Sequence, residues 1–257
     1  MFYRLARRCG DDKIELEHDQ LTDRISTHMN TKIKGISSMA TRQVLADLVS
    51  AYQADTGVTV DIESVGGVDA ARRVLAGEAF DVVILASDAI AKLQAAGRVV
   101  EGSAIDLVHS GVAVAVRAGT PVPDISDEGA VRKAVLAANT LSYSTGPSGV
   151  ALAKLFERWG IADEIKGRIV QAPVGVPVGA LVARGEVELG FQQLSELLHV
   201  DGITIVGPLP AAIQITTTFT AGLVTDCNQV EAVRDLLAFM TSPAAADAKR
   251  RQGMEPA

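Results

Sequence analysis

Cysteine and histidine are scarce in this sequence of 257 residues. It contains two cysteines, Cys9 and Cys227, and four histidines, His18, His28, His109 and His199. Two cysteines are too few for a disulfide scaffold, and neither residue type shows the spacing of a metal site. We therefore expect neither disulfide bonds nor a bound metal.

Positive charge and long apolar runs are also lacking. The chain has 24 Lys and Arg against 31 Asp and Glu, a formal net charge of -7. A nucleic-acid surface needs clustered Lys and Arg, so we expect no nucleic-acid partner. No apolar stretch reaches the roughly 18 residues that span a bilayer, which predicts no membrane insertion. The 48% of hydrophobic residues is enough for a large core in a globular protein.

The first 30 residues lack the uninterrupted apolar stretch of a secretory signal. The segment "MFYRLARRCGDDKIELEHDQLTDRISTHMN" starts with basic residues and then turns polar and acidic. We therefore expect a cytoplasmic protein from the sequence as it stands, and a periplasmic one if the start is misassigned. Met29 directly precedes the first predicted strand, so residues 1–31 are predicted to be a disordered or non-native extension.

From residue 32 onward, β-rich runs alternate with helical patterns, which is typical of an α/β protein. The apolar residues Val44, Leu45, Leu48, Val49 and Tyr52 fall at helical spacing. Strands are predicted at 32–37, 57–64, 80–87, 109–119, 140–144, 168–174, 202–210 and 213–225, and at 187–197, where the strand ends in a polar turn. The pattern indicates two α/β lobes, lobe I of residues 32–117 plus 211–257 and lobe II of residues 118–210, with a ligand cleft between them.

Three strand-to-helix loops, "GISSMA", "SVGGVDAAR" and "STGPSGV", carry small and hydroxyl residues. Backbone N–H groups and the helix dipole at such a position favour an anion. Serine also caps helices, and glycine and serine are common in turns, so capping alone is the plainer explanation. None of the loops matches the phosphate loop or the full dinucleotide fingerprint, and we expect no cofactor.

The order of elements and several segments resemble the type II periplasmic binding proteins, most closely their molybdate-binding branch. The likeness rests on the serine turn before the first long helix, on "ARRVLAGEAFDVVILASD", "GPSGVALAKLFERWG" and "GEVELGFQQLSEL", and on the closing "GMEPA". It implies a two-lobe α/β fold in which two crossovers join the lobes and a small anionic ligand is bound between them. It also implies a monomer, and it leaves open a partnership with an ABC transporter permease.

The resemblance implies a ligand shell drawn from both lobes. Gly66 and Gly67 offer only backbone N–H groups where the family has a hydroxyl, and a glutamine replaces the tyrosine of the molybdate binders. The implied ligand-binding residues are Ser37, Ser38, Gly66, Gly67, Arg72, Ser148, Gly149, Gln192 and Gln193. These departures admit a larger organic anion, whose carboxylate Arg72 or its neighbour Arg73 could reach bidentately. Either arginine could instead lie solvated on the helix face.

Two functions remain open at this point. The sequence favours reversible binding of a molybdate-like oxyanion or a small organic carboxylate, as in the substrate-binding proteins of ABC transporters. The alternative is an isomerase, since the family has an offshoot resembling aconitate isomerase that moves a double bond in an unsaturated tricarboxylate. Such a 1,3-proton shift needs a base close to the carbon acid and donors for the charge that develops. Glu196, His109 or a serine of the cleft could be that base.

Overall fold

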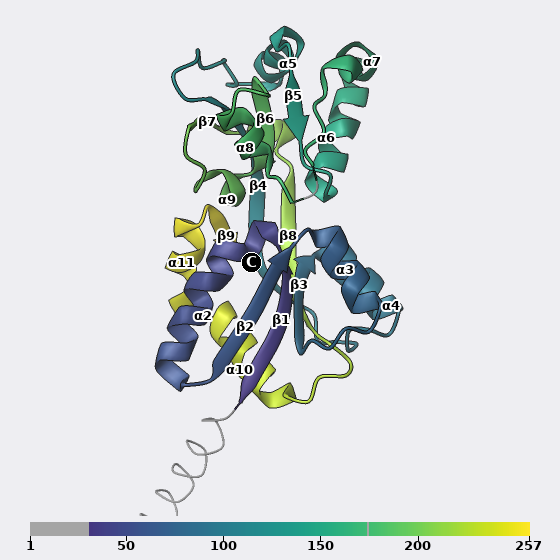
Figure 1. Ribbon diagram of the computed structural model, residues 1–257, viewed down its shortest axis with the longest axis vertical. Helices are drawn as coiled ribbons and strands as arrows, with labels where there is room; N and C mark the ends of the chain where they lie inside the picture. The colour runs from purple at the N-terminus through teal and green to yellow at the C-terminus, as the bar shows by residue number, and fades with distance from the viewer. Residues whose placement is uncertain (1–30, 174) are drawn as a thin grey trace, which may run out of the picture.

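The computed structural model of the chain describes residues 31–173 and 175–257. The predicted N-terminal extension therefore lies outside the described residues except for Thr31. The described strands form one nine-stranded mixed sheet, in which the path β2-β1-β3-β8-β4-β6-β5 is joined by β7 and β9, both paired with β4. Figure 1 shows the sheet running through two groups of elements, one above the other.

The lower group is built on three parallel strands and one antiparallel strand. These are β1 (Lys32–Ser38), β2 (Thr59–Val65), β3 (Val82–Ala86) and β8 (Thr216–Leu223). Their helices are α2 (Arg42–Thr56), α3 (Gly67–Leu75), α4 (Ser87–Ala95) and α10 (Val230–Thr241), and a short 3-10 turn η1 (Met39–Thr41) leads into α2. Alternate strand residues face opposite sides, so Ile33 and Ile84 pack with α2 and α10, whereas Ile36 and Leu85 pack with α3 and α4.

The upper group surrounds the second half of the long strand β4 (Ile105–Arg117). Its other strands are β5 (Leu141–Tyr143), β6 (Leu189–Gln193) and β7 (Ile203–Pro208). Its helices are α5 (Glu128–Ala137), α6 (Pro147–Arg158), α7 (Ala162–Ile165), α8 (Val178–Ala183) and α9 (Leu194–Leu197), with the 3-10 turns η2 (Lys166–Arg168) and η3 (Ala211–Ile213). Phe156 of α6 packs edge to face on Phe191 of β6, with 6.1 Å between the ring centroids.

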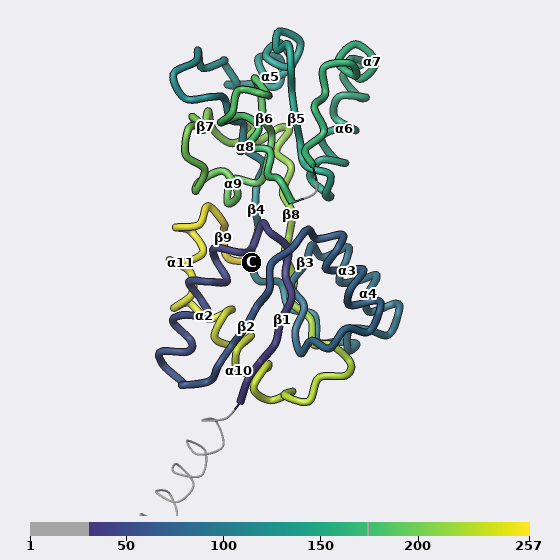
Figure 2. The backbone as a smooth tube through the Cα atoms, in the orientation of Figure 1, coloured from purple at the N-terminus to yellow at the C-terminus, as the bar shows by residue number. Residues whose placement is uncertain are grey.

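The strand β4 belongs to both groups, as the tube in Figure 2 makes easy to follow. Residues up to Gly111 pair with β8 and β9, and residues from Val112 onward pair with β6 and β7. The first crossing therefore lies inside the strand at Gly111 and Val112, rather than at the predicted boundary after residue 117. The chain returns to the lower group along the segment that leads into β8.

Two segments differ from the sequence prediction. The prediction of a strand at 168–174 is wrong for the described residues of this segment. They form no strand, and Ile169 alone makes an isolated bridge, to Leu141. Pro173 lacks an N–H for a strand ladder, which explains part of this failure. The C-terminal elements were not predicted: the 3-10 turn η4 (Pro243–Ala245), α11 (Ala246–Arg251) and β9 (Met254–Pro256). Within the described part of the chain, no helix is long and apolar enough to cross a membrane.

Candidate functional site

The ends of β1 and β2 bring hydroxyl groups beside the start of α3. The parallel register places Ser37 opposite Ser64, and their Oγ atoms are 2.8 Å apart. Ser38 is 7% exposed, and its Oγ has no hydrogen-bond partner among the described residues. Gly67 begins α3, and a Cβ there would lie 3.6 Å from the Cβ of Ser38. The first N–H groups of α3 have no partner inside the helix. The ends of β1 and β2 therefore present two kinds of donor, serine hydroxyls and backbone N–H groups.

The end of β6 contributes an amide to the crossing between the two groups. Gln193 is 3% exposed and its Nε2 donates to Oγ1 of Thr217 on β8 at 2.9 Å. Its Oε1 is buried and has no partner in the described part of the chain. Two residues later, Ser195 Oγ donates to the backbone carbonyl of Ala40 at 2.9 Å, which ties α9 to η1.

A third set of hydroxyls lies where the chain enters α6. Pro147 occupies the first turn of the helix, and Ser148 Oγ is 3.0 Å from Ser144 Oγ. Gly149 packs so tightly on the preceding loop that a Cβ would overlap the carbonyl oxygen of Ser144. No Cβ-bearing residue fits this backbone arrangement without movement of the loop.

The N-terminal ends of α2, α3 and α6 are directed toward the middle of the molecule, where β4 and β8 pass from one group to the other (Figure 1). Helix N-termini carry partial positive charge and free N–H groups. Ser38 and Gln193, each with an unpaired buried oxygen, are drawn from the elements that meet here. A buried polar atom without a partner calls for an explanation, and contact with a bound ligand is one. Ser38 Oγ and the helix N-termini are neutral donors suited to an anion, whereas the unpaired Gln193 Oε1 is an acceptor.

Gln192 differs from Gln193 because both ends of its amide are engaged within the protein. Its Oε1 accepts the backbone N–H of Gly179 at 3.0 Å, and its Nε2 donates to Glu196 Oε1 at 2.9 Å. The side chain is 3% exposed. The predicted ligand residue Gln192 therefore contacts a helix N-terminus and a carboxylate in this structure.

Glu196, on α9, is the titratable group whose environment is most unusual here. Burial raises the pKa of its carboxyl from the ordinary 4.5 to about 7, although the hydrogen bond from Gln192 lowers it. Burial disfavours the charged form, and a donor to the carboxylate favours it, so burial dominates. A carboxyl with a pKa near neutrality is suited to accept and return a proton.

The raised pKa of Glu196 predicts how stability depends on pH. The folded protein binds this proton more tightly than the unfolded chain, so the contribution is complete below pH 4.5 and is lost as the pH rises through about 7. The loss is about 3 kcal/mol in the free energy of unfolding. Because Glu196→Gln removes the titration, the stability of this variant relative to the unmodified protein should increase between about pH 5 and pH 8.5. Urea unfolding at both values measures this, and an equal stability difference at the two pH values would contradict it.

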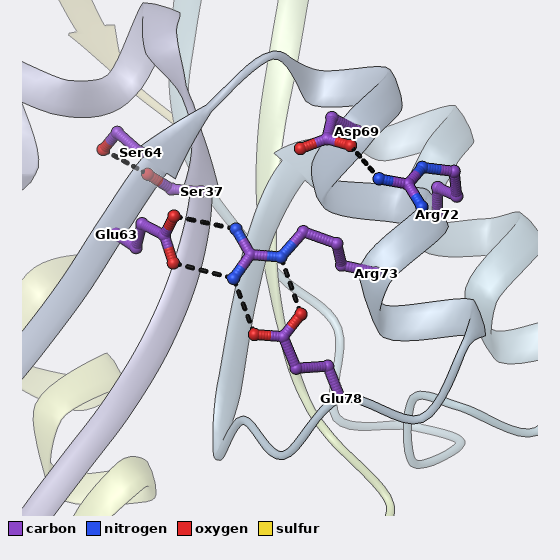
Figure 3. A network of polar contacts seen from close by, with 7 residues as sticks. All are labelled: Ser37, Glu63, Ser64, Asp69, Arg72, Arg73 and Glu78. Carbon is purple, nitrogen blue, oxygen red and sulfur yellow. Dashed lines mark hydrogen bonds and ion pairs between the residues drawn. The ribbon is translucent and has the colours of Figure 1, made fainter.

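The two arginines predicted as carboxylate binders are both engaged in ion pairs (Figure 3). Arg73 donates to both oxygens of Glu63 at 2.8 Å and to those of Glu78 at 2.7 and 2.6 Å. Hydrogen bonds from Arg73 lower the pKa of both carboxyls. Arg72 pairs with Asp69 on the surface of α3. The predicted ligand contact of Arg73 is therefore not supported. Its guanidinium N–H groups already donate to the carboxylates of Glu63 and Glu78.

Arg73→Ala is expected to lower the thermal unfolding midpoint and to leave ligand affinity unchanged. The substitution removes the guanidinium that pairs with both Glu63 and Glu78 and leaves the two carboxylates close together, which is unfavourable for the folded state. Thermal unfolding and ligand titration of the variant test this, with Arg72→Ala, which leaves that network intact, as the control for unfolding. A large loss of affinity with unchanged stability would restore Arg73 to the ligand shell.

His109 does not lie beside the hydrogen bond between Gln193 and Thr217. Its Nδ1 is 2.9 Å from Oγ1 of Thr218 on β8. Successive strand residues point to opposite faces, so His109 and Thr217 lie on opposite sides of the sheet. The same alternation places Gln192, whose amide contacts Glu196, on the opposite side from Gln193. Among the predicted sources of a base, Glu196 is therefore distinguished by its raised pKa rather than by its side of the sheet.

Several residues of the site were not singled out from the sequence. Ser64 supplies the hydroxyl that the "GGVD" loop lacks, and Ser144, Ser195 and Thr217 each bond to a neighbour at the site. The threonine run "TTT" at 216–218 was a visible signal, and Ser64 and Ser144 are the first residues of the loops "SVGGVDAAR" and "STGPSGV". Among the described residues, no group of three or more His, Cys, Asp or Glu side chains could hold a metal ion.

Comparison with known proteins identifies the family of this chain and its relatives. The family model for bacterial extracellular solute-binding protein matches residues 33–255. An aconitate isomerase of a Pseudomonas species is 38% identical over 232 residues, which are 88% of each chain.

Among solved structures, the periplasmic molybdate-binding protein of Azotobacter vinelandii has a TM-score of 0.72 at 20% identity, over 86% of this chain and 98% of that one. A tungstate-binding protein of Desulfovibrio alaskensis has a TM-score of 0.66 at 16% identity, over 88% of this chain and 99% of that one. These likenesses confirm the predicted type II periplasmic-binding-protein fold, but at such identity they say nothing of the ligand. Together with the family match and the 38% identity, they show that this chain belongs to the bacterial extracellular solute-binding proteins.

Proposed function

We propose that this protein binds a small unsaturated tricarboxylate of the aconitate type and isomerises it by a 1,3-proton shift. The observation that carries the proposal is Glu196, a carboxyl whose pKa is raised to about 7 and which lies on the short helix α9 of the upper group, next to Ser195, which bonds to Ala40 of the lower group. The aconitate isomerase that shares 38% identity over most of both chains supports the same activity. Reversible binding without turnover, the function favoured by the sequence, has less support.

The proton shift needs one base and no additional reactant. Glu196, as carboxylate, takes a proton from a saturated carbon next to a carboxylate of the substrate, and the electron pair is delocalised through the adjacent double bond. Glu196, now protonated and able to exchange this hydrogen with solvent, then donates a proton to the carbon at the other end of the three-carbon unit. The double bond has then moved by one position, and the charge and composition of the substrate are unchanged. A group with a pKa near the working pH is effective in both steps.

The neutral donors at the strand ends are suited to the charge that develops in this reaction. Removing the proton places additional negative charge on a substrate carboxylate, as in an enolate. Fixed hydrogen-bond donors and helix N-termini stabilise such charge without having to reorganise. Ser38 Oγ, the N–H groups at the start of α3 and the hydroxyls at the start of α6 are donors of this kind.

Incubation of the protein with cis- or trans-aconitate in heavy water tests the proposal. We expect conversion to the other isomer, with deuterium incorporated at the carbon that receives the proton, both followed by NMR. Thermal unfolding with aconitate, citrate, molybdate and tungstate separates binding from turnover, since a ligand at 100 times its dissociation constant stabilises by roughly 2.7 kcal/mol. Stabilisation by molybdate or tungstate alone, without conversion of aconitate, would overturn the proposed activity.

Ser38→Ala combined with Gln193→Ala is expected to weaken aconitate binding at least about tenfold, since two buried hydrogen-bonding groups are removed. Titration calorimetry measures the affinity, and circular dichroism checks the fold. Ser242→Ala is the matched control, because Ser242 Oγ is also buried and unpaired among the described residues but follows α10 in the lower group. Equal affinities of the double variant and the control would show that these atoms do not face the ligand.

A further inference from the structure

We propose that Gln192 is a positioning residue, which holds one oxygen of Glu196 and leaves the other oxygen directed to the substrate. The inference rests on the proposed function and adds a residue to it. It assigns Gln192 a role other than the ligand contact expected from the sequence. Gln192 touches Glu196 and α8, and acts on the reaction through Glu196 alone.

The orientation of the Gln192 amide is fixed by its oxygen. The N–H of Gly179 belongs to the first turn of α8 (Val178–Ala183), where backbone donors have no partner within the helix. It donates to Gln192 Oε1 at 3.0 Å in a fully buried contact. A flipped amide would place two donors against each other, which is unfavourable in a buried position. The backbone of α8 therefore determines which end of Gln192 faces Glu196.

The nitrogen end consequently donates to the carboxylate. Gln192 Nε2 is 2.9 Å from Glu196 Oε1, and the two residues are four positions apart, across the junction of β6 and α9. Glu196 Oε2 makes no hydrogen bond with the described residues and is not among their fully buried unpaired atoms. One carboxylate oxygen is thus held by Gln192, and the other has no hydrogen bond with the described residues.

The hydrogen bond from Gln192 is the polar contact that orients the Glu196 carboxyl. Helix α9 packs on β4, β6 and η1, which bring the uncharged residues Ala113, Ala115 and Ala40 to it. The titratable His199, three residues further along, is 2.6 Å from Gln252, which in turn donates to Asp47. The bond from Ser195 to Ala40 anchors the helix itself. Gln192 is the side chain that both orients the carboxylate and favours its ionised form.

Gln192→Glu is the informative substitution because it keeps an acceptor for the Gly179 N–H and removes the donor to Glu196. Two carboxyls in contact do not ionise together, so the pKa of Glu196 should rise further. We expect kcat at neutral pH to fall at least about tenfold, the acidic limb of the kcat profile to move at least about one pH unit upward, and KM to change less than about twofold. Gln192→Met, which removes both hydrogen bonds without adding charge, provides a second test if the first variant does not fold.

Asn139→Asp is the matched control. Asn139 Nδ2 donates to Glu188 Oε1 at 2.9 Å, so the control makes the same amide-to-carboxyl change at an exposed pair of the same upper group. We expect its kcat, KM and pH profile to equal those of the unmodified protein. A fall in kcat equal to that of the Gln192 variants would overturn the positioning role.

The carboxyl titration of Glu196, followed by carbon NMR and assigned with Glu196→Gln, separates this inference from the proposed function. It requires neither substrate nor turnover. An unchanged titration in both Gln192 variants would overturn the inference even if the unmodified protein is an active isomerase. A shifted titration in a protein that does not convert aconitate would overturn the proposed function and leave the contact between Gln192 and Glu196 standing. A shifted titration together with a shifted kcat profile supports both.

Discussion

Glu196→Gln is expected to reduce aconitate isomerisation by a factor of about 10² to 10⁴ while binding is retained. This is the usual contribution of a positioned general base. Glutamine has nearly the same shape as glutamate but cannot accept a proton at neutral pH. The donors assigned to the ligand, including Ser38 and the N-terminus of α3, are not changed by the substitution. Removing a carboxylate beside an anionic substrate gives no reason for weaker binding.

The measurement is the initial rate of isomerisation together with the affinity for aconitate from calorimetry. Glu188→Gln is the control, because Glu188 is a carboxylate of the same upper group that also accepts a hydrogen bond from an amide, that of Asn139. Asn139 lowers the pKa of Glu188, whereas burial raises that of Glu196. The control should keep full activity. An active Glu196→Gln variant would remove Glu196 from the mechanism, and an inactive one that no longer binds would make it a ligand contact.

If the proposed activity holds, the rate of the unmodified protein should also rise with pH through about 7, as Glu196 becomes ionised. Stability moves in the opposite direction over the same range, since ionising a buried carboxyl costs free energy in the folded protein. The group that makes the site reactive at neutral pH is therefore expected to make the fold less stable there. Such opposition between stability and function is common where a site needs an unfavourable environment.

The elements with strong periodic patterns could be predicted from the sequence. The apolar positions of α2 and the fully buried strand β3 are determined by local pattern and lie where expected. The crossing inside β4 could not be read in this way, because the apolar run "GVAVAV" continues through the point where the pairing partners change. The short elements α11 and β9 depend on contacts with residues far away in the chain, such as the bond from the buried Lys249 to the carbonyl of Leu107.

For the site, the sequence indicated which loops supply donors but not which atoms are free. Arg73 looked available because its partners, Glu63 on β2 and Glu78 after α3, are distributed along the chain. Gln192 and Gln193 are adjacent, and strand alternation alone says only that they face opposite sides. Their different partners, Gly179 and Glu196 for one and Thr217 for the other, are set by how α8 and β8 pack on β6. Tertiary contacts therefore determine both the ion pairs of Arg73 and the different partners of Gln192 and Gln193.

The second large effect is expected from Gly149→Ala, in the first turn of α6. A methyl group there would overlap the carbonyl oxygen of Ser144, so the loop or the helix must move. Overlap with backbone cannot be relieved by a side-chain rotation, and we expect the free energy of unfolding to fall by about 3 kcal/mol or more. The same movement displaces Ser148 from Ser144, whose hydroxyls are 3.0 Å apart, so affinity for aconitate should fall at least about tenfold.

Gly146→Ala, three residues earlier in the same loop, is the matched control for urea unfolding and calorimetry. Gly146 has a φ of -80°, which alanine adopts freely, and the nearest atom to its added Cβ would be Ser144 Oγ at 4.0 Å. Because alanine is a poorer N-cap than glycine, we expect a cost of up to about 1 kcal/mol and little change in affinity. If both variants were equally stable and bound aconitate equally well, the loop would have room for the methyl group. The close packing of Gly149 on Ser144 would then not be what holds the α6 hydroxyls in the site.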